Sequence, residues 1–78
     1  MADLKLFFVY LKDYDAIKGL ELRLWASERG FRILSVARGE IDTMYVQATN
    51  DGMELMKAKF DFISDYKTAE DLKLKIDQ

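Results

Sequence analysis

The chain has no cysteine, no histidine and no proline among its 78 residues. Without cysteine it forms no disulfide and offers no thiolate to a metal, which favours a reducing compartment for so short a chain. Without histidine it lacks the commonest general base and metal ligand. The four glycines are too scattered to form a phosphate-binding loop or a dinucleotide fingerprint. We therefore expect no metal, no cofactor and no enzymatic activity.

The chain also lacks a large excess of charge of either sign, because it has 12 basic and 14 acidic residues and a net charge of −2. This balance gives no strong attraction to nucleic acid or to an anionic membrane. Paired carboxylates occur at Asp13/Asp15, Glu40/Asp42, Asp61/Asp65 and Glu70/Asp71. They fall at expected helix caps, turns and solvent faces, so we interpret them as capping and solubilising groups rather than as a catalytic pair.

Half of the residues are hydrophobic and a third are charged, which is typical of a soluble globular chain. The length predicts a single small domain over residues 1–78. The one apolar run, Leu4–Leu11, is far shorter than the roughly 20 residues of a membrane helix. Asp3 precedes it and no small-residue cleavage site follows, which argues against a signal peptide. We expect a complete product that begins at Met1 and stays in the cytoplasm.

Leu4–Leu11 predicts a strand that is buried on both faces, because seven of its eight residues are apolar or aromatic. A helix is expected next, from about Asp13 to Glu28, with Asp13 or Asp15 as its cap and Gly30 as its end.

On this helix Ile17, Leu20 and Leu24 share one face at spacings of three and four, which predicts that they pack on the core. Leu22 projects away from that face, and we interpret it as a single exposed leucine.

Two further strands, Phe31–Arg38 and Ile41–Thr49, are separated by a turn at Arg38-Gly39-Glu40. Alternation predicts that Leu34 and Val36 lie on the core face of the first, together with the apolar positions of the second. The other face would then carry Ile33 and Tyr45.

Two interpretations of the next segment remain open. In one, Asn50-Asp51-Gly52 is a three-residue hairpin loop, and residues 56–62 form a fourth strand that sets Val46 opposite Met56. In the other, Asp51 caps a helix and Glu54 completes a capping box. We favour the hairpin, because turn, alternation and register agree.

A last helix is predicted over residues 68–77. The preferred fold is α+β in the order β-α-β-β-β-α, a small antiparallel sheet with two helices packed on it. The alternative is a ferredoxin-like variant in the order β-α-β-β-α(-α).

In the hairpin interpretation one face of the sheet is mixed rather than polar. It would present Phe7 or Phe8, depending on the parity of the first strand, and would bring Tyr45 beside Lys57 and Lys59. The candidate binding surface comprises Phe7, Val9, Ile33, Tyr45, Lys57, Lys59, Leu22 and Trp25.

We expect a small intracellular protein-interaction module, an adaptor, regulatory subunit or inhibitor, of the kind encoded by viruses or mobile elements. Its partner would be another protein or a second copy in a sheet-to-sheet homodimer. The alternative is a domain that binds single-stranded nucleic acid through Tyr45, Lys57 and Lys59. Asp61 on the same predicted face and the negative net charge weigh against it.

Overall fold

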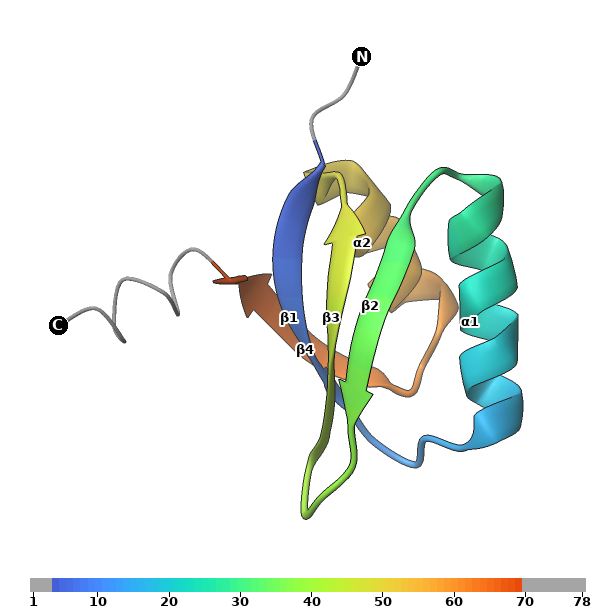
Figure 1. The fold of residues 1–78 in the computed structure, drawn as a ribbon, viewed down its shortest axis with the longest axis vertical. Helices are drawn as coiled ribbons and strands as arrows, with labels where there is room; N and C mark the ends of the chain where they lie inside the picture. The colour runs from blue at the N-terminus through green and yellow to red at the C-terminus, as the bar shows by residue number, and fades with distance from the viewer. Residues whose placement is uncertain (1–3, 70–78) are drawn as a thin grey trace, which may run out of the picture.

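The computed structural model describes residues 4–69. The chain forms β1 (Lys5–Leu11), α1 (Ala16–Glu28), β2 (Arg32–Ala37), β3 (Asp42–Ala48), α2 (Asn50–Lys59) and β4 (Ile63–Thr68) (Figure 1). The strands build one sheet in the order β2-β3-β1-β4, with every neighbouring pair antiparallel. The predicted α+β class, an antiparallel sheet with two helices packed on it, is confirmed. The preferred element order β-α-β-β-β-α is wrong, because residues 50–59 form a helix and residues 63–68 form the fourth strand. The observed order, β-α-β-β-α-β, is the arrangement of ferredoxin-like folds.

β1 is a central strand whose two faces differ. It pairs with β3 on one edge and with β4 on the other, so that Phe7 lies opposite both Val46 and Thr68. Phe7, Val9 and Leu11 are buried against the helices, whereas the side chains between them are only half buried. The prediction that both faces of Leu4–Leu11 are buried is therefore wrong for one face, because both helices lie on the same side of the sheet (Figure 1).

The predicted ends of α1 are confirmed. The Asp15 carboxylate accepts a hydrogen bond from the backbone N–H of Lys18 at 2.9 Å. At the other end Gly30 has a φ of 77°, in the left-handed region that glycine adopts without a steric penalty. The N–H of Phe31 then donates to the carbonyl of Ala26 at 2.9 Å, which closes a Schellman motif.

The predicted rotation of α1 about its axis is wrong. Leu22 is 1% exposed and Trp25 is also buried, whereas Ile17, Leu20 and Leu24 are 73%, 62% and 62% exposed. The predicted core stripe therefore faces away from the sheet.

Small residues explain this orientation of α1. Gly19 and Ala26 lie on the same side as Leu22, and both are buried. The ring of Tyr14 covers Gly19 so closely that a Cβ there would collide with it. Small residues at these positions let the helix backbone approach its neighbours, and a stripe of three large aliphatic residues would hold it further away.

The preferred hairpin at residues 50–52 is wrong, and the helical alternative is correct. Residues 50–59 form α2, which buries Met53 and Met56. Its cap is Thr49 rather than the predicted Asp51, because the Thr49 hydroxyl accepts a hydrogen bond from the N–H of Gly52 at 2.9 Å. The alternation over residues 56–62 therefore does not mark a strand. Its first part belongs to α2, in which Met53 and Met56 recur at helical spacing.

The fourth strand is β4 (Ile63–Thr68), a segment for which no strand was predicted. Its buried positions are few, because β4 is the end strand of the sheet order β2-β3-β1-β4. It is held by pairing with β1, from Phe7 opposite Thr68 to Leu11 opposite Ile63. Residues 70–77 of the predicted last helix lie outside the described residues.

A β-bulge in β2 overturns the predicted parity of that strand. Ile33 lies opposite Val46 and Val36 lies opposite Met44, so two residues instead of one separate these core-facing positions. Leu34 is consequently exposed, and Ile33 packs against the core.

Candidate interaction surface

The side of the sheet away from the helices carries an aromatic cluster on its two central strands. The register sets Phe8 of β1 opposite Tyr45 of β3, and alternation places Tyr10 on the same side. The ring centroids of Phe8 and Tyr45 are 5.1 Å apart, and those of Phe8 and Tyr10 are also 5.1 Å apart, with the rings edge to face. These contacts favour a rigid aromatic platform over independently mobile rings.

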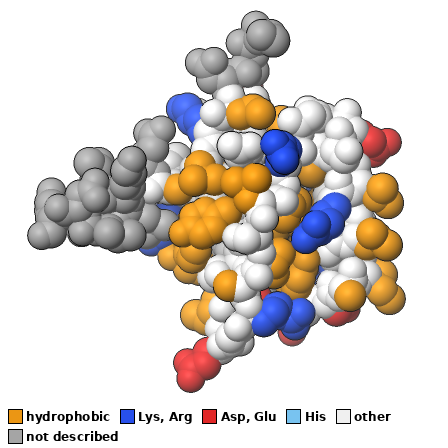
Figure 2. Space-filling model, viewed as in Figure 1, with side chains coloured by type: hydrophobic (Ala, Val, Ile, Leu, Met, Phe, Trp, Pro, Cys, Tyr) orange, Lys and Arg blue, Asp and Glu red, His pale blue; other side chains and the backbone are white. Residues whose placement is uncertain are grey.

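Charged and polar side chains lie around this platform. Lys67 of β4 lies opposite Phe8, and its ammonium is 5.5 Å from the centroid of the Tyr10 ring. Arg32 extends from β2, opposite Gln47. We name as the open sheet face the residues Leu6, Phe8, Tyr10, Arg32, Thr43, Tyr45, Gln47, Asp65 and Lys67. Figure 2 shows this side of the molecule, with hydrophobic side chains gathered over the strands and basic side chains beside them.

Of the predicted candidate surface, only Tyr45 lies on the open sheet face, where it is 37% exposed. Lys57 and Lys59 are exposed on α2, on the other side of the sheet, so their predicted alignment with Tyr45 is wrong. The remaining predicted surface residues lie in or against the core, namely Phe7, Val9, Leu22, Trp25 and Ile33.

Sequence reasoning missed Tyr10 and Lys67 as members of this surface and gave Phe8 only as an alternative to Phe7. The two aromatic residues share the parity of Leu6, and the resulting aromatic face of the strand was visible in the sequence. Lys67 was not predictable, because its position depends on the pairing of β4 with β1 across more than half of the chain.

A second apolar surface lies on α1. We name Ile17, Leu20 and Leu24 the outer stripe, because all three are exposed and point away from the sheet. Hydrophobic side chains follow the α1 margin of the molecule, at the right of Figure 2. Exposed aliphatic side chains are common singly, but three successive ones on one helical face form a continuous apolar ridge.

An open groove of about 620 Å³ runs between α1 and the segment that joins α2 to β4. Aromatic side chains of Trp25, Phe60 and Phe62 line it. Trp25 and Phe60 meet edge to face with their ring centroids 5.7 Å apart. The charged lining residues are Lys18, Glu21, Glu28, Lys59 and Asp61.

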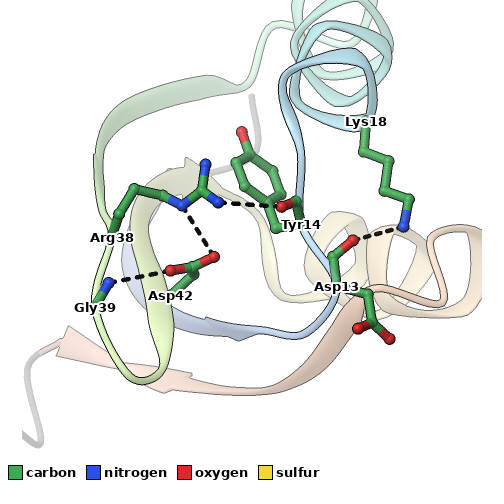
Figure 3. Close-up of polar contacts among 6 residues, drawn as sticks. All are labelled: Asp13, Tyr14, Lys18, Arg38, Gly39 and Asp42. Carbon is green, nitrogen blue, oxygen red and sulfur yellow. Dashed lines mark hydrogen bonds and ion pairs between the residues drawn. The ribbon is translucent and has the colours of Figure 1, made fainter.

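Polar contacts hold the turn between β2 and β3 in place. The Asp42 carboxylate lies 3.0 Å from Nε of Arg38 and accepts a hydrogen bond from the N–H of Gly39 at 3.1 Å (Figure 3). Arg38 Nη2 donates to the carbonyl of Tyr14 at 3.3 Å, which connects the hairpin to the loop before α1. Asp42 and Asp15 thus serve a turn and a helix cap, as predicted for these carboxylates.

One titratable group in the described residues has a clearly perturbed environment. Burial raises the pKa of the Tyr66 hydroxyl above its ordinary value, and the nearby carboxylates of Glu54 and Asp65 raise it further. The charged form of the Tyr66 hydroxyl is therefore disfavoured in the folded protein.

Among residues 4–69 no three acidic side chains come close enough together to hold a metal ion. The same residues bury no charged or polar side chain. Neither of the two helices described is long and apolar enough to span a membrane.

Comparison of the chain with protein-family models, with curated proteins and with solved structures finds no significant match.

Proposed function

We propose that this protein is a small binding module that acts by surface contact with another protein and without catalysis, as an adaptor, regulatory subunit or inhibitor. The observation that supports this proposal is the aromatic platform of Phe8, Tyr10 and Tyr45 on the open sheet face. Aromatic side chains contribute large apolar areas at little cost in conformational entropy, and they are enriched at protein interfaces.

The arrangement of the open sheet face also fits an interface. Its apolar centre lies on the two central strands, and its charged residues lie on the edge strands, with Arg32 on β2 and with Asp65 and Lys67 on β4. An apolar centre with a polar rim is the usual anatomy of a specific protein contact. Because the rim carries both signs of charge, the partner surface should be mixed in charge rather than strongly acidic or basic.

We place this activity in the cytoplasm. A chain of this size that has no disulfide and no structural metal ligand of the usual kinds relies on its hydrophobic core, which a reducing compartment does not disturb. An inhibitor encoded by a virus or a mobile element would meet its target in the same compartment.

Affinity capture from a cell extract tests the proposal. Wild-type protein and the Leu55→Glu variant should retain the same partner, because Leu55 is exposed on α2 and away from the open sheet face. Tyr45→Glu should lose the partner, because it places a charge in the centre of the platform, and Tyr45→Phe should keep it. If no captured protein depends on Tyr45 or Phe8, the proposal is wrong.

A second candidate function is the binding of single-stranded nucleic acid on the same face. The specific observation is that aromatic rings occupy the central strands while Arg32 and Lys67 occupy the two edges. Bases could stack on the rings while phosphates meet the cations. The net charge of −2 and Asp65 on the same face make this the weaker candidate.

Fluorescence anisotropy with labelled single-stranded RNA and DNA separates the two candidates. Nucleic-acid binding would weaken as salt rises, and it would weaken more in Lys67→Ala than in Lys59→Ala, a matched lysine on α2. No binding at low salt would remove the second candidate and leave the first unaffected.

A further inference from the structure

We propose that the outer stripe of α1 is a homodimer interface in which α1 packs in parallel against α1 of a second copy. This surface is separate from the open sheet face, so the inference goes beyond the proposed function. The first reason is exposure, because Ile17, Leu20 and Leu24 are the large aliphatic residues that the fold leaves most open on this helix. Their spacing of three and four is that of the a and d positions of a coiled coil.

The opposite side of α1 is already occupied. Leu22, Trp25 and Ala26 are buried in the core, so the helix is anchored to its own sheet while the outer stripe remains available. A second helix could therefore pack on the stripe without disturbing the protomer.

The charged residues beside the outer stripe indicate that a second copy of the chain packs on it. Glu21 and Glu28 lie on one side of it and line the groove beside α1, whereas Arg23 lies on the other side and does not line that groove. All three are exposed, and no ion pair joins any of them to another residue of the described chain. Among residues 4–69, each copy thus offers Glu21 and Glu28 on the groove side of the stripe and Arg23 on the other side, with no ion-pair partner for any of them.

A second copy complements these flanks in only one direction. With Ile17 and Leu24 at a positions, Arg23 occupies a g position and Glu28 an e position. In a parallel pair the g position of one helix lies beside the e position of the next heptad on the other helix, so Arg23 of each copy meets Glu28 of the other. In an antiparallel pair like flanks meet, and Arg23 would approach its own symmetry mate. The two-fold symmetry of the parallel arrangement forms the Arg23–Glu28 contact twice and buries both outer stripes.

Sedimentation or light scattering over a range of concentrations tests whether the dimer forms and where. Wild-type protein and Leu55→Glu should give a concentration-dependent dimer, whereas Leu20→Glu and Leu24→Glu should be monomeric with unchanged circular dichroism. A wild-type monomer at every concentration would overturn the proposal. So would a dimer that survives Leu20→Glu but is lost in Phe8→Lys, because self-association would then belong to the open sheet face.

Charge exchange tests the register. Arg23→Glu should weaken the dimer by about tenfold or more, since it replaces two attractive contacts with two repulsive ones. The double variant Arg23→Glu/Glu28→Arg should restore wild-type affinity. A double variant as weak as Arg23→Glu alone would contradict the parallel pairing.

Introduced thiols test the direction independently, because the chain has no cysteine of its own. In a parallel dimer each position on the stripe faces its own copy, so Ile17→Cys and Leu24→Cys should both form intermolecular disulfides. In an antiparallel pair centred near Leu20, either thiol would lie about 10 Å from its mate along the axis, which is beyond disulfide reach. Cross-linking in neither variant would overturn the proposal, and Leu55→Cys is the control that should not cross-link.

Discussion

Leu22 and Leu24 lie two positions apart on α1 and occupy opposite sides of it, with 1% and 62% of their surfaces exposed. Leu22→Ala should lower the free energy of unfolding by about 2–5 kcal/mol, because it leaves a cavity in the core. Leu24→Ala should change it by about 0.5 kcal/mol or less in the monomer. Urea unfolding at low protein concentration measures both, and equal losses would contradict the observed rotation of α1.

Thr49→Ala should destabilise the protein by about 1 kcal/mol, because it removes the hydroxyl that caps α2 through the N–H of Gly52. Asn50→Ala, one position into the helix, is the matched control and should have a smaller effect. Urea unfolding again provides the measurement. A larger loss in Asn50→Ala than in Thr49→Ala would be expected of a hairpin turn and would count against the helix.

Gly30→Ala should cost about 1 kcal/mol of stability, because a side chain at a φ of 77° meets the penalty of the left-handed region. Gly39→Ala is the control, because Gly39 does not have a positive φ and the space around its Cβ position is open. Thermal unfolding should show a clearly lower midpoint for Gly30→Ala than for wild type and an unchanged midpoint for Gly39→Ala. Equal midpoints would indicate that the Schellman end of α1 adapts at no cost.

The stability of the folded protein should depend on pH in alkaline solution, because the Tyr66 hydroxyl ionises there. Its pKa is raised in the folded protein above the ordinary value of 10.0, so the folded state holds the proton more tightly than the unfolded state. The resulting stabilisation is complete below pH 10 and is lost as the pH rises through the folded pKa.

Phenylalanine does not ionise, so the stability gap between wild type and Tyr66→Phe should change with pH, and wild type should lose stability relative to the variant as the pH rises through the folded pKa of Tyr66. Unfolding curves of both proteins at neutral and alkaline pH test this, because groups common to both cancel in the difference. A gap that stays constant with pH would show that Tyr66 does not contribute in this way.

The elements that sequence reasoning predicted correctly are those with local stop signals. Asp15 and Gly30 delimit α1, and the turn around Gly39 separates β2 from β3. Local capping and turn chemistry require only nearby residues, which is why these boundaries can be read from the sequence.

Sequence reasoning failed where two local patterns competed for one segment, or where pairing with a distant strand determines the structure of a segment. On α1 the stripe of larger aliphatic residues was chosen over the face of Leu22, although Gly19 and Ala26 mark that face as the one that approaches its neighbours closely. After Gly52 a strand-like alternation was preferred to a helix. The identity of β4 depends on its pairing with β1, and no pattern within Ile63–Thr68 specifies that pairing.

The central position of β1 also affects how the protein folds during synthesis. The strand emerges early from the ribosome, yet it pairs along one edge with Ile63–Thr68, which emerges last among the described elements. Until then β1 has an apolar face and an unpaired edge, a combination that favours aggregation. Folding of this domain should therefore be a late, concerted event, and a chain that stops before residue 63 should depend on chaperones to stay in solution.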